Sequence, residues 1–274
     1  MTSTAESAGG DGAVSARPAQ PHLLLRLSAP LVAFGGPTID ANGIVTDYPA
    51  ASMVTGLLAN ALGVDRRAVA QLARLQERLV FGARIDRRGP RIRDFQTAQL
   101  SQRDPAWTTR GRPLEREGGA ASFRSPHLRF RHYDTDVLIL LALRLEPAAE
   151  APDLAALAKA LAFPARPLFF GRKPCLPSAP ILIGMMDAAD IHDALARAEA
   201  LDADVPATKT TGKRDAFWPA GEGPDDPAST ERLTVSDGRD WRAGVHAGSR
   251  TLIRGEVALP AAPSPETAGE AHHG

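Results

Sequence analysis

The 274-residue sequence is poor in several features, and each scarcity excludes a class of protein. Cys175 is the only cysteine, which excludes an internal disulfide and a Cys-x-x-Cys zinc site and is typical of a reducing compartment. No run approaches the roughly eighteen apolar residues that span a bilayer. Residues 1–21 also lack the basic and apolar segments of an export signal. We therefore expect a cytoplasmic protein with no membrane partner, and we assign no role to Cys175.

Short catalytic motifs are missing as well. The sequence contains no GxGxxG, GxSxG or HExxH pattern, so it does not predict a dinucleotide site, a hydrolase nucleophile elbow or a zinc protease. The nearest approach to a phosphate-binding loop, residues 207–214, lacks the leading glycine and the Ser or Thr after the lysine. We expect neither a cofactor nor a resident metal.

Lysine is scarce, with 4 residues against 28 arginines, and twelve of the arginines fall between Arg84 and Arg131. Five acidic residues in that stretch leave a local excess of seven positive charges in a chain whose formal net charge is +0. Five aromatic residues lie in or beside the stretch: Phe95, Trp107, Phe123, Phe130 and Tyr133. Cations for phosphates and rings for bases are typical of single-stranded RNA binding. A solvated basic face, or a general preference for arginine, explains the same pattern.

Hydrophobic periodicity in the first third of the chain predicts two strands and two helices. Leucines at alternate positions predict a strand over residues 23–28, which Pro30 should terminate. Helical spacing after Pro49 predicts a helix that ends at Gly63. Asp65 is placed to cap a second helix, and residues 79–85 read as a strand. From 87 to 125 the periodicity is lost, which indicates a long loop that is either functional or disordered.

The remaining segments alternate in the same way. Residues 137–145 are apolar at nearly every position, as in a central strand covered on both faces. Asp153 should cap a short helix, and residues 181–184 should form a strand. Three further assignments complete the chain: a helix over 187–201, a Pro/Gly/Asp-rich loop over 205–230, and two or three closing strands over 231–259.

This order of elements predicts an α+β fold with helices on one face of a sheet. Strand, helix, strands, helix and strand in succession fit the ferredoxin-like arrangement of RNA-recognition domains, which we place at residues 21–200. A loop and a smaller C-terminal β-rich region should follow over 201–259. Residues 1–20 and 260–274, rich in small and polar residues, read as a disordered leader and tail.

Gly171-Arg172-Lys173 is the sharpest candidate site in the sequence. It follows two phenylalanines, Phe169 and Phe170, which strand geometry would divide between core and surface. Glycine permits close approach of the backbone to a phosphate, and two adjacent cations can then engage its oxygens. An ordinary basic turn between a helix and a strand explains the same residues.

The segment His132-Tyr133-Asp134-Thr135-Asp136 offers a second candidate. On an extended strand His132, Asp134 and Asp136 would share one face and could bind a divalent ion, but three such ligands on one strand are seldom enough. We prefer an interpretation in which the two aspartates pair with neighbouring arginines. A further alternative is a metal-independent ribonuclease, with His132 as general base and Tyr133 or Lys173 as proton donor or phosphate clamp.

Several of these segments, in this order, resemble the CasD family of the type I-E CRISPR surveillance complex, Cascade. The resemblance covers about residues 21–259 and rests on five stretches: residues 23–36 (LLLRLSAPLVAFGG), 48–63 (YPAASMVTGLLANALG), 92–97 (IRDFQT), 131–133 (RHY) and 170–177 (FGRKPCLP). It implies a non-catalytic subunit that holds the 5′ handle of CRISPR RNA. The aperiodic basic stretch, about 87–125, would be a thumb inserted in the ferredoxin-like domain.

The same resemblance implies partners and contact residues. The partners would be the crRNA 5′ handle and other Cascade subunits, both the backbone and the large subunit, with target DNA reached indirectly. The residues expected to bind RNA are Arg26, Arg93, Arg124, Arg129, Arg131, Tyr133, Gly171, Arg172 and Lys173. Two alternatives stay open. One is an endoribonuclease of CRISPR precursor RNA that uses His132, Tyr133 and Lys173; the other is a scaffold whose basic loop meets an acidic protein.

Overall fold

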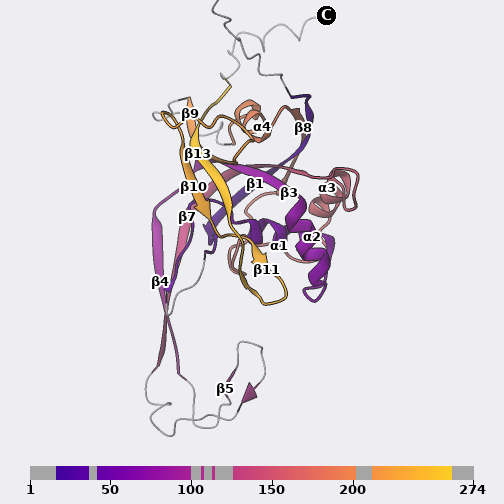
Figure 1. Cartoon of the computed structure of the whole chain (residues 1–274). Coiled ribbons are helices and arrows are strands. Elements are labelled where there is room, and N and C mark those ends of the chain that lie inside the picture. The colour runs from indigo at the N-terminus through magenta and orange to yellow at the C-terminus, as the bar shows by residue number, and fades with distance from the viewer. Residues whose placement is uncertain are drawn as a thin grey trace, which may run out of the picture.

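A computed structural model describes residues 17–36, 42–99, 106–107, 113–114, 126–201 and 212–260. A nine-stranded, mostly antiparallel sheet occupies its centre (Figure 1). The strands of this sheet are β1 (Gln20–Val32), β2 (Asn42–Gly43), β3 (Leu79–Arg87), β4 (Arg91–Ala98), β7 (His127–Leu145), β8 (Leu182–Ala188), β9 (Lys213–Pro219), β10 (Glu231–Val235) and β13 (Arg250–Ala258). Two short pairs are separate from it: β5 (Ala106–Trp107) with β6 (Pro113–Leu114), and β11 (Arg239–Asp240) with β12 (Val245–His246).

The order of strands across the sheet is β10-β13-β9-β3-β7-β1-β8, and both β4 and β2 add to β7. The prediction of strands at 23–28 and 137–145 is confirmed, because these residues form the buried parts of β1 and β7. Pro30 does not terminate β1, which runs on to Val32. Pro30 is exposed and lies beyond the last residue that β8 pairs, Leu25, so its missing N–H costs the sheet little.

Helices cover both faces of the sheet. Three of them, α1 (Ala51–Leu62), α2 (Val69–Arg78) and α3 (Leu154–Ala162), pack with one face of β1 and β7 into a large core, and α4 (Ile191–Arg197) packs on the opposite face (Figure 1). The expectation of helices on one face therefore fails for α4. Burial from both sides explains why residues 137–145 are apolar at every second position and at most of those between.

Helix ends follow the sequence signals in two cases and depart from them in one. Gly63 adopts φ 76° after α1, and the Asp153 carboxylate accepts the Ala156 N–H at 2.8 Å at the start of α3, both as predicted. The prediction that Asp65 caps the second helix is wrong. Its carboxylate accepts the backbone N–H of Arg67 in a preceding turn, and α2 begins four residues later, at Val69.

Part of the basic segment is a strand, not a loop. β4 pairs along its whole length with residues His127–Asp134 of β7, and the two form a ribbon that projects from the sheet (Figure 1). Most β4 side chains are exposed, so no hydrophobic alternation marks this strand in the sequence. Arg124 and most of the stretch from 100 to 125 lie outside the described residues.

The loop predicted over 205–230 is also wrong in part. β9 lies between β3 and β13, and its Phe217 and Trp218 are buried. This strand has only seven residues and is flanked by Gly, Pro and Asp, so the composition of the whole segment indicated a loop. The closing strands predicted over 231–259 are present, and the predicted helix over 187–201 is shorter, as α4. In the described ranges no helix is long and apolar enough to cross a membrane.

Candidate nucleic-acid interface

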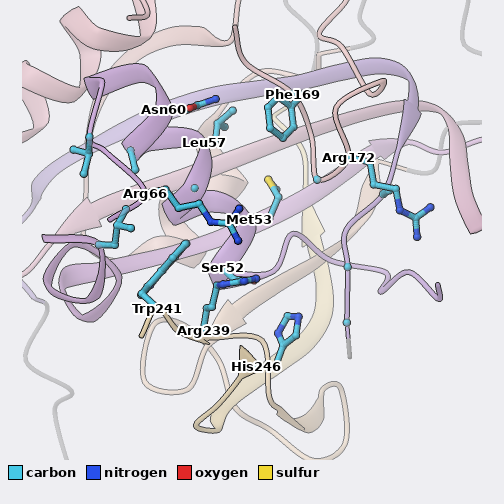
Figure 2. Close-up of a pocket in the computed structure, with 18 of the residues that line it drawn as sticks. Ser52, Met53, Leu57, Asn60, Arg66, Phe169, Arg172, Arg239, Trp241 and His246 are labelled. Atoms are coloured by element: carbon cyan, nitrogen blue, oxygen red, sulfur yellow. The ribbon is translucent and has the colours of Figure 1, made fainter. Parts of the chain in front are cut away.

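A cavity of about 530 Å³ lies on the face of the sheet that α1, α2 and α3 cover (Figure 2). Five separate parts of the chain line it. They are the turn after β1 with nearby Ile44, one side of α1, the turn before α2 together with Leu72, the segment from Arg166 to Arg172, and the β11–β12 hairpin. The hairpin lies at the opposite end of the sequence from α1, so the cavity exists only in the folded chain.

Four arginines line this cavity, Arg66, Arg166, Arg172 and Arg239, and no lining residue is acidic. Arg166 donates to the carbonyls of Val64 and Gly63, at 2.7 and 3.0 Å, and Arg172 donates to the carbonyls of His132 and Gly43. Neutral carbonyls orient these guanidinium groups without cancelling their charge. Arg66 and Arg239 form no ion pair within the part of the chain that the structure describes. The cavity therefore carries a concentrated positive charge.

Arg239 is half-buried and lies near the charge of Arg66. Burial, together with the nearby charge of Arg66, lowers the pKa of Arg239 below its usual value. An arginine stays protonated at neutral pH even so, because its ordinary pKa is far above 7. Two like charges held together without a carboxylate favour an anionic ligand, whose charge would offset both.

The opposite wall of the cavity is apolar. Met53 and Leu57 of α1 and the half-buried ring of Phe169 line it, and Figure 2 shows them grouped across the cavity from Arg239 and His246. Gly56 also lines the cavity, and the space beside it is open, since a Cβ added there would meet no atom within 4 Å. Trp241 also lines the cavity, and the guanidinium of Arg239 lies 5.6 Å from the centre of its ring system.

The Gly171-Arg172 turn forms one edge of the cavity. Gly171 has φ 89°, and an added Cβ would lie 1.8 Å from the carbonyl oxygen of Ala33, so only glycine fits. Arg172 follows, half-buried, with its guanidinium 4.8 Å from the ring centre of Tyr133. The structure therefore brings two of the predicted residues to the cavity. Lys173 is exposed beside them and does not line it.

Two other predicted residues lie elsewhere. Tyr133 is only 5% exposed and packs in the core beneath Arg172, which argues against stacking of its ring on a base. Arg26 is on β1 next to Leu25 and Leu27, whose side chains face the large core under α1 to α3. Because neighbouring strand residues point to opposite faces, Arg26 projects to the α4 side, away from the cavity.

The predicted arginines of the ribbon divide between its two faces. Arg93 lies opposite His132 with its guanidinium 5.0 Å from the ring centre of Phe130, whereas Arg129 and Arg131 lie on the other face, which they share with Tyr133. All three arginines are exposed. Arg131 and Arg129 thus continue the positive charge from the Tyr133 and Arg172 edge of the cavity along the ribbon.

The residues of the alternative ribonuclease site do not converge. His132 and Tyr133 are neighbours on β7, so their side chains point to opposite faces, and the His132 carbonyl accepts from Arg172. The aspartates pair with arginines as predicted: Asp134 with Arg91 at 2.6 Å, and Asp136 with Arg87. In the described segments, no group of three His, Cys, Asp or Glu side chains is placed to hold a metal ion.

Comparison with known proteins relates this architecture to one family. A family model described as CRISPR-associated protein (Cas_Cas5) matches residues 22–253, a range that includes every residue lining the cavity. The chain belongs to the Cas5 family. A curated member, the CRISPR system Cascade subunit CasD of Escherichia coli (strain K12), is 29% identical over 184 residues, which cover 67% of this chain and 80% of that protein. The resemblance to CasD proposed from the sequence is thus confirmed.

Two solved structures are similar in fold. A chain of a CRISPR RNA-guided surveillance complex has a TM-score of 0.62 and 22% identity, and the match covers 89% of this chain and 95% of that one. A second structure, titled as a crystal structure of a Cas protein, has a TM-score of 0.53 and 27% identity over 87% of this chain and 95% of the other. The first of these similarities supports the fold alone.

Sequence reasoning missed most of the cavity of this Cas5 chain. Arg66, Arg166 and Arg239 come from three separate segments with no shared motif, and Trp241 follows Arg239 in a region read only as closing strands. Phe169 was noted for its burial and not for a site. A weak signal is present in retrospect: Arg239 and Trp241 are a cation and a large ring two residues apart in a short hairpin.

Proposed function

We propose that this Cas5 chain is a non-catalytic, RNA-binding subunit of a type I-E CRISPR Cascade complex. It holds the 5′ handle of the crRNA and contacts neighbouring backbone and large subunits in the cytoplasm, and it meets target DNA only through that assembly. The observation that carries the proposal is the cavity lined by four arginines and no acidic residue. The similarity to the Cascade subunit CasD supplies the biological setting.

The chemistry of the cavity favours single-stranded RNA over an acidic protein partner. Charge alone would serve both ligands, but the apolar wall of Met53, Leu57 and Phe169 provides a surface for a base. Gly35 brings backbone with open space beside it to the rim, since an added Cβ would meet no atom within 4 Å, and this permits close approach of a phosphodiester. A single strand presents bases and phosphates together, whereas a duplex hides its bases.

The arrangement of the central strands supports the ferredoxin-like part of the proposal. β1, β3, β7 and β8 follow one another in the chain with α1 and α2 after β1 and α3 after β7, and their spatial order is β8-β1-β7-β3, all antiparallel. This is the order in which a ferredoxin-like unit places its four strands. The projecting ribbon of β4 and β7 then corresponds to the thumb, a surface for backbone subunits and the guide.

Salt dependence of RNA binding tests the proposal directly. The full chain is titrated with the crRNA recovered from its own native assembly at several salt concentrations. Each phosphate contact adds about 0.7 to the slope of log affinity against log salt on a single strand. The double variant R66Q/R239Q should lower that slope by about 1.4. The matched variant R67Q/R242Q removes two exposed arginines that lie near Arg66 and Arg239 in the sequence. Neither lines the cavity, so this variant should keep the slope.

Two further measurements address the alternative functions. Incubation of the chain with labelled repeat RNA in EDTA should leave the RNA intact, and clean cleavage that H132A abolishes would replace the non-catalytic assignment with the ribonuclease. Nuclease treatment of the purified assembly should release this subunit. Cohesion that survives removal of the RNA would favour a protein scaffold.

A further inference from the structure

We propose that the cavity takes one nucleotide of single-stranded RNA, turned out of the strand, with its phosphate between Arg66 and Arg239 and its base against Phe169. The inference rests on the proposed function and adds a specific subsite to it. It also makes the C-terminal β11–β12 hairpin part of the RNA site, since Arg239 comes from that hairpin.

Size argues for a single nucleotide. At about 530 Å³ the cavity has the volume of pockets that take one small ligand, roughly 300 to 1,000 Å³, and it is partly open, with helix, turn and hairpin around it. A run of stacked bases needs an extended groove instead. A base that enters this space must leave its neighbours, as unstacked bases do in sequence-specific RNA recognition.

The two walls divide the nucleotide between them. Arg66 and Arg239 approach from the turn before α2 and from β11, and Figure 2 shows both side chains directed into the cavity. The ring of Phe169 and the side chains of Leu57 and Met53 lie across from Arg239, and Arg66 reaches in beside Met53. A nucleotide can contact both walls at once if its phosphate lies against the two arginines and its base lies against the ring of Phe169.

The backbone of the hairpin that carries Arg239 is held in place before any ligand arrives. Gln76 of α2 pairs with the backbone of Arg239 twice, accepting its N–H at 3.0 Å and donating to its carbonyl at 3.2 Å. Asp237, two residues earlier, accepts the N–H groups of Ala51 and Ser52 at the start of α1 and is itself held by Arg250. These contacts tie the hairpin to both helices, and a preformed site loses less conformational entropy on binding.

The base half of the site has a matched pair of phenylalanines for its test. Phe169 lines the cavity, whereas Phe163, six residues earlier, is 82% exposed and does not. An abasic nucleotide is moved one position at a time along the handle RNA, and affinity for the full chain is measured. One position should lose about tenfold, the size expected for one stacked base, and its neighbours much less.

The variants then assign that position to the ring. F169A should lose about tenfold with intact RNA and show no further loss at the sensitive position, while F163A should behave as wild type. F169L keeps most of the apolar volume without a π face and should reproduce F169A, so a folding defect in F169A does not decide the result. Thermal melting of each variant reports its fold.

The outcomes separate this subsite from the function on which it rests. The single-nucleotide site is refuted, and the RNA-binding function stands, if RNA binds with the expected salt slope but no abasic position loses affinity. The same holds if the abasic nucleotide still lowers the affinity of F169A and F169L at the sensitive position. If the chain binds no RNA at any salt concentration, both are refuted.

Discussion

Arg172 is held by Tyr133 and by the backbone around it. Its guanidinium lies 4.8 Å from the centre of the Tyr133 ring, and its two terminal nitrogens donate to the carbonyls of His132 and Gly43 at 2.8 and 3.0 Å. Gly43 is required for this approach, since an added Cβ would lie 2.7 Å from one of those nitrogens. The planar, forked guanidinium can meet all three partners together. The charge of Arg172 is therefore fixed at the edge of the cavity.

Replacing Arg172 by lysine should weaken RNA binding although the charge is kept. A lysine ammonium cannot stack on Tyr133 and donate to both carbonyls in the same geometry. We expect a loss of about tenfold in affinity for the handle RNA, on the order of one charge-assisted hydrogen bond. R131K, at an exposed position on β7, should change affinity much less. Unchanged affinity in R172K would show that charge alone matters at Arg172.

Alanine at Gly171 should destabilise the fold. The residue has φ 89° and its added Cβ would collide with the Ala33 carbonyl, so the turn must move. We expect a decrease of more than about 1 kcal/mol in the free energy of unfolding by urea, with lower RNA affinity because Arg172 moves with the turn. G184A is the matched control, since its methyl group meets no atom within 4 Å. Similar losses for both variants would contradict the steric explanation.

Removing Asp86 should be costly because Arg84 is fully buried. The carboxylate receives two hydrogen bonds from Arg84, at 2.7 and 2.9 Å, and the same guanidinium donates to carbonyls around the end of α4. D86A leaves an uncompensated buried charge, which we expect to cost about 3 to 5 kcal/mol in urea unfolding. E231A, which breaks an exposed pair with Arg254, should cost less than about 1 kcal/mol. A loss of that smaller size for D86A would show that the carbonyls alone sustain Arg84.

Stability should fall as the pH drops below about 6.5. Burial is the main cause that lowers the pKa values of His22 and His192, so the folded chain holds both imidazoles neutral where the unfolded chain binds protons. Above that pH neither state is protonated and the effect vanishes; below it the loss grows until the lower folded pKa is reached. Urea unfolding at pH 7.5 and 5.5 measures it.

The variant H192F tests the origin of this pH dependence. His192 lies edge-on to Trp218 at 4.8 Å between ring centres, and phenylalanine keeps an aromatic ring there without a titrating group. H192F should lose less stability between the two pH values than wild type does. An unchanged pH dependence would assign the effect to other groups.

Local signals predicted the elements whose burial is regular. Alternating leucines marked β1, continuous apolar residues marked β7, and Asp153 and Gly63 marked helix ends, because these patterns are written over a few neighbouring positions. The sequence did not predict β4, because both of its faces are exposed and its residues show no hydrophobic alternation. It did not predict β9, because turn-forming residues flank this short strand.

The cavity was predicted only at one of its edges. The Gly171-Arg172 turn is a local motif, so it was visible in the sequence. Arg66 and Arg239 are more than 170 positions apart and become neighbours only because Gln76 and Asp237 dock the hairpin on α1 and α2. No periodicity encodes that docking. Likewise, Tyr133 was expected at the surface because strand alternation does not say which face is covered.

β7 runs without interruption from the projecting ribbon to the middle of the sheet, and its His132 carbonyl anchors Arg172. The backbone anchor of Arg172 therefore lies within the ribbon itself, and Asp136, with φ 45°, breaks the regular strand geometry between the ribbon and the middle of the sheet. Any partner that displaces the ribbon would therefore also displace the carbonyl that anchors Arg172, so the two surfaces are mechanically connected through His132.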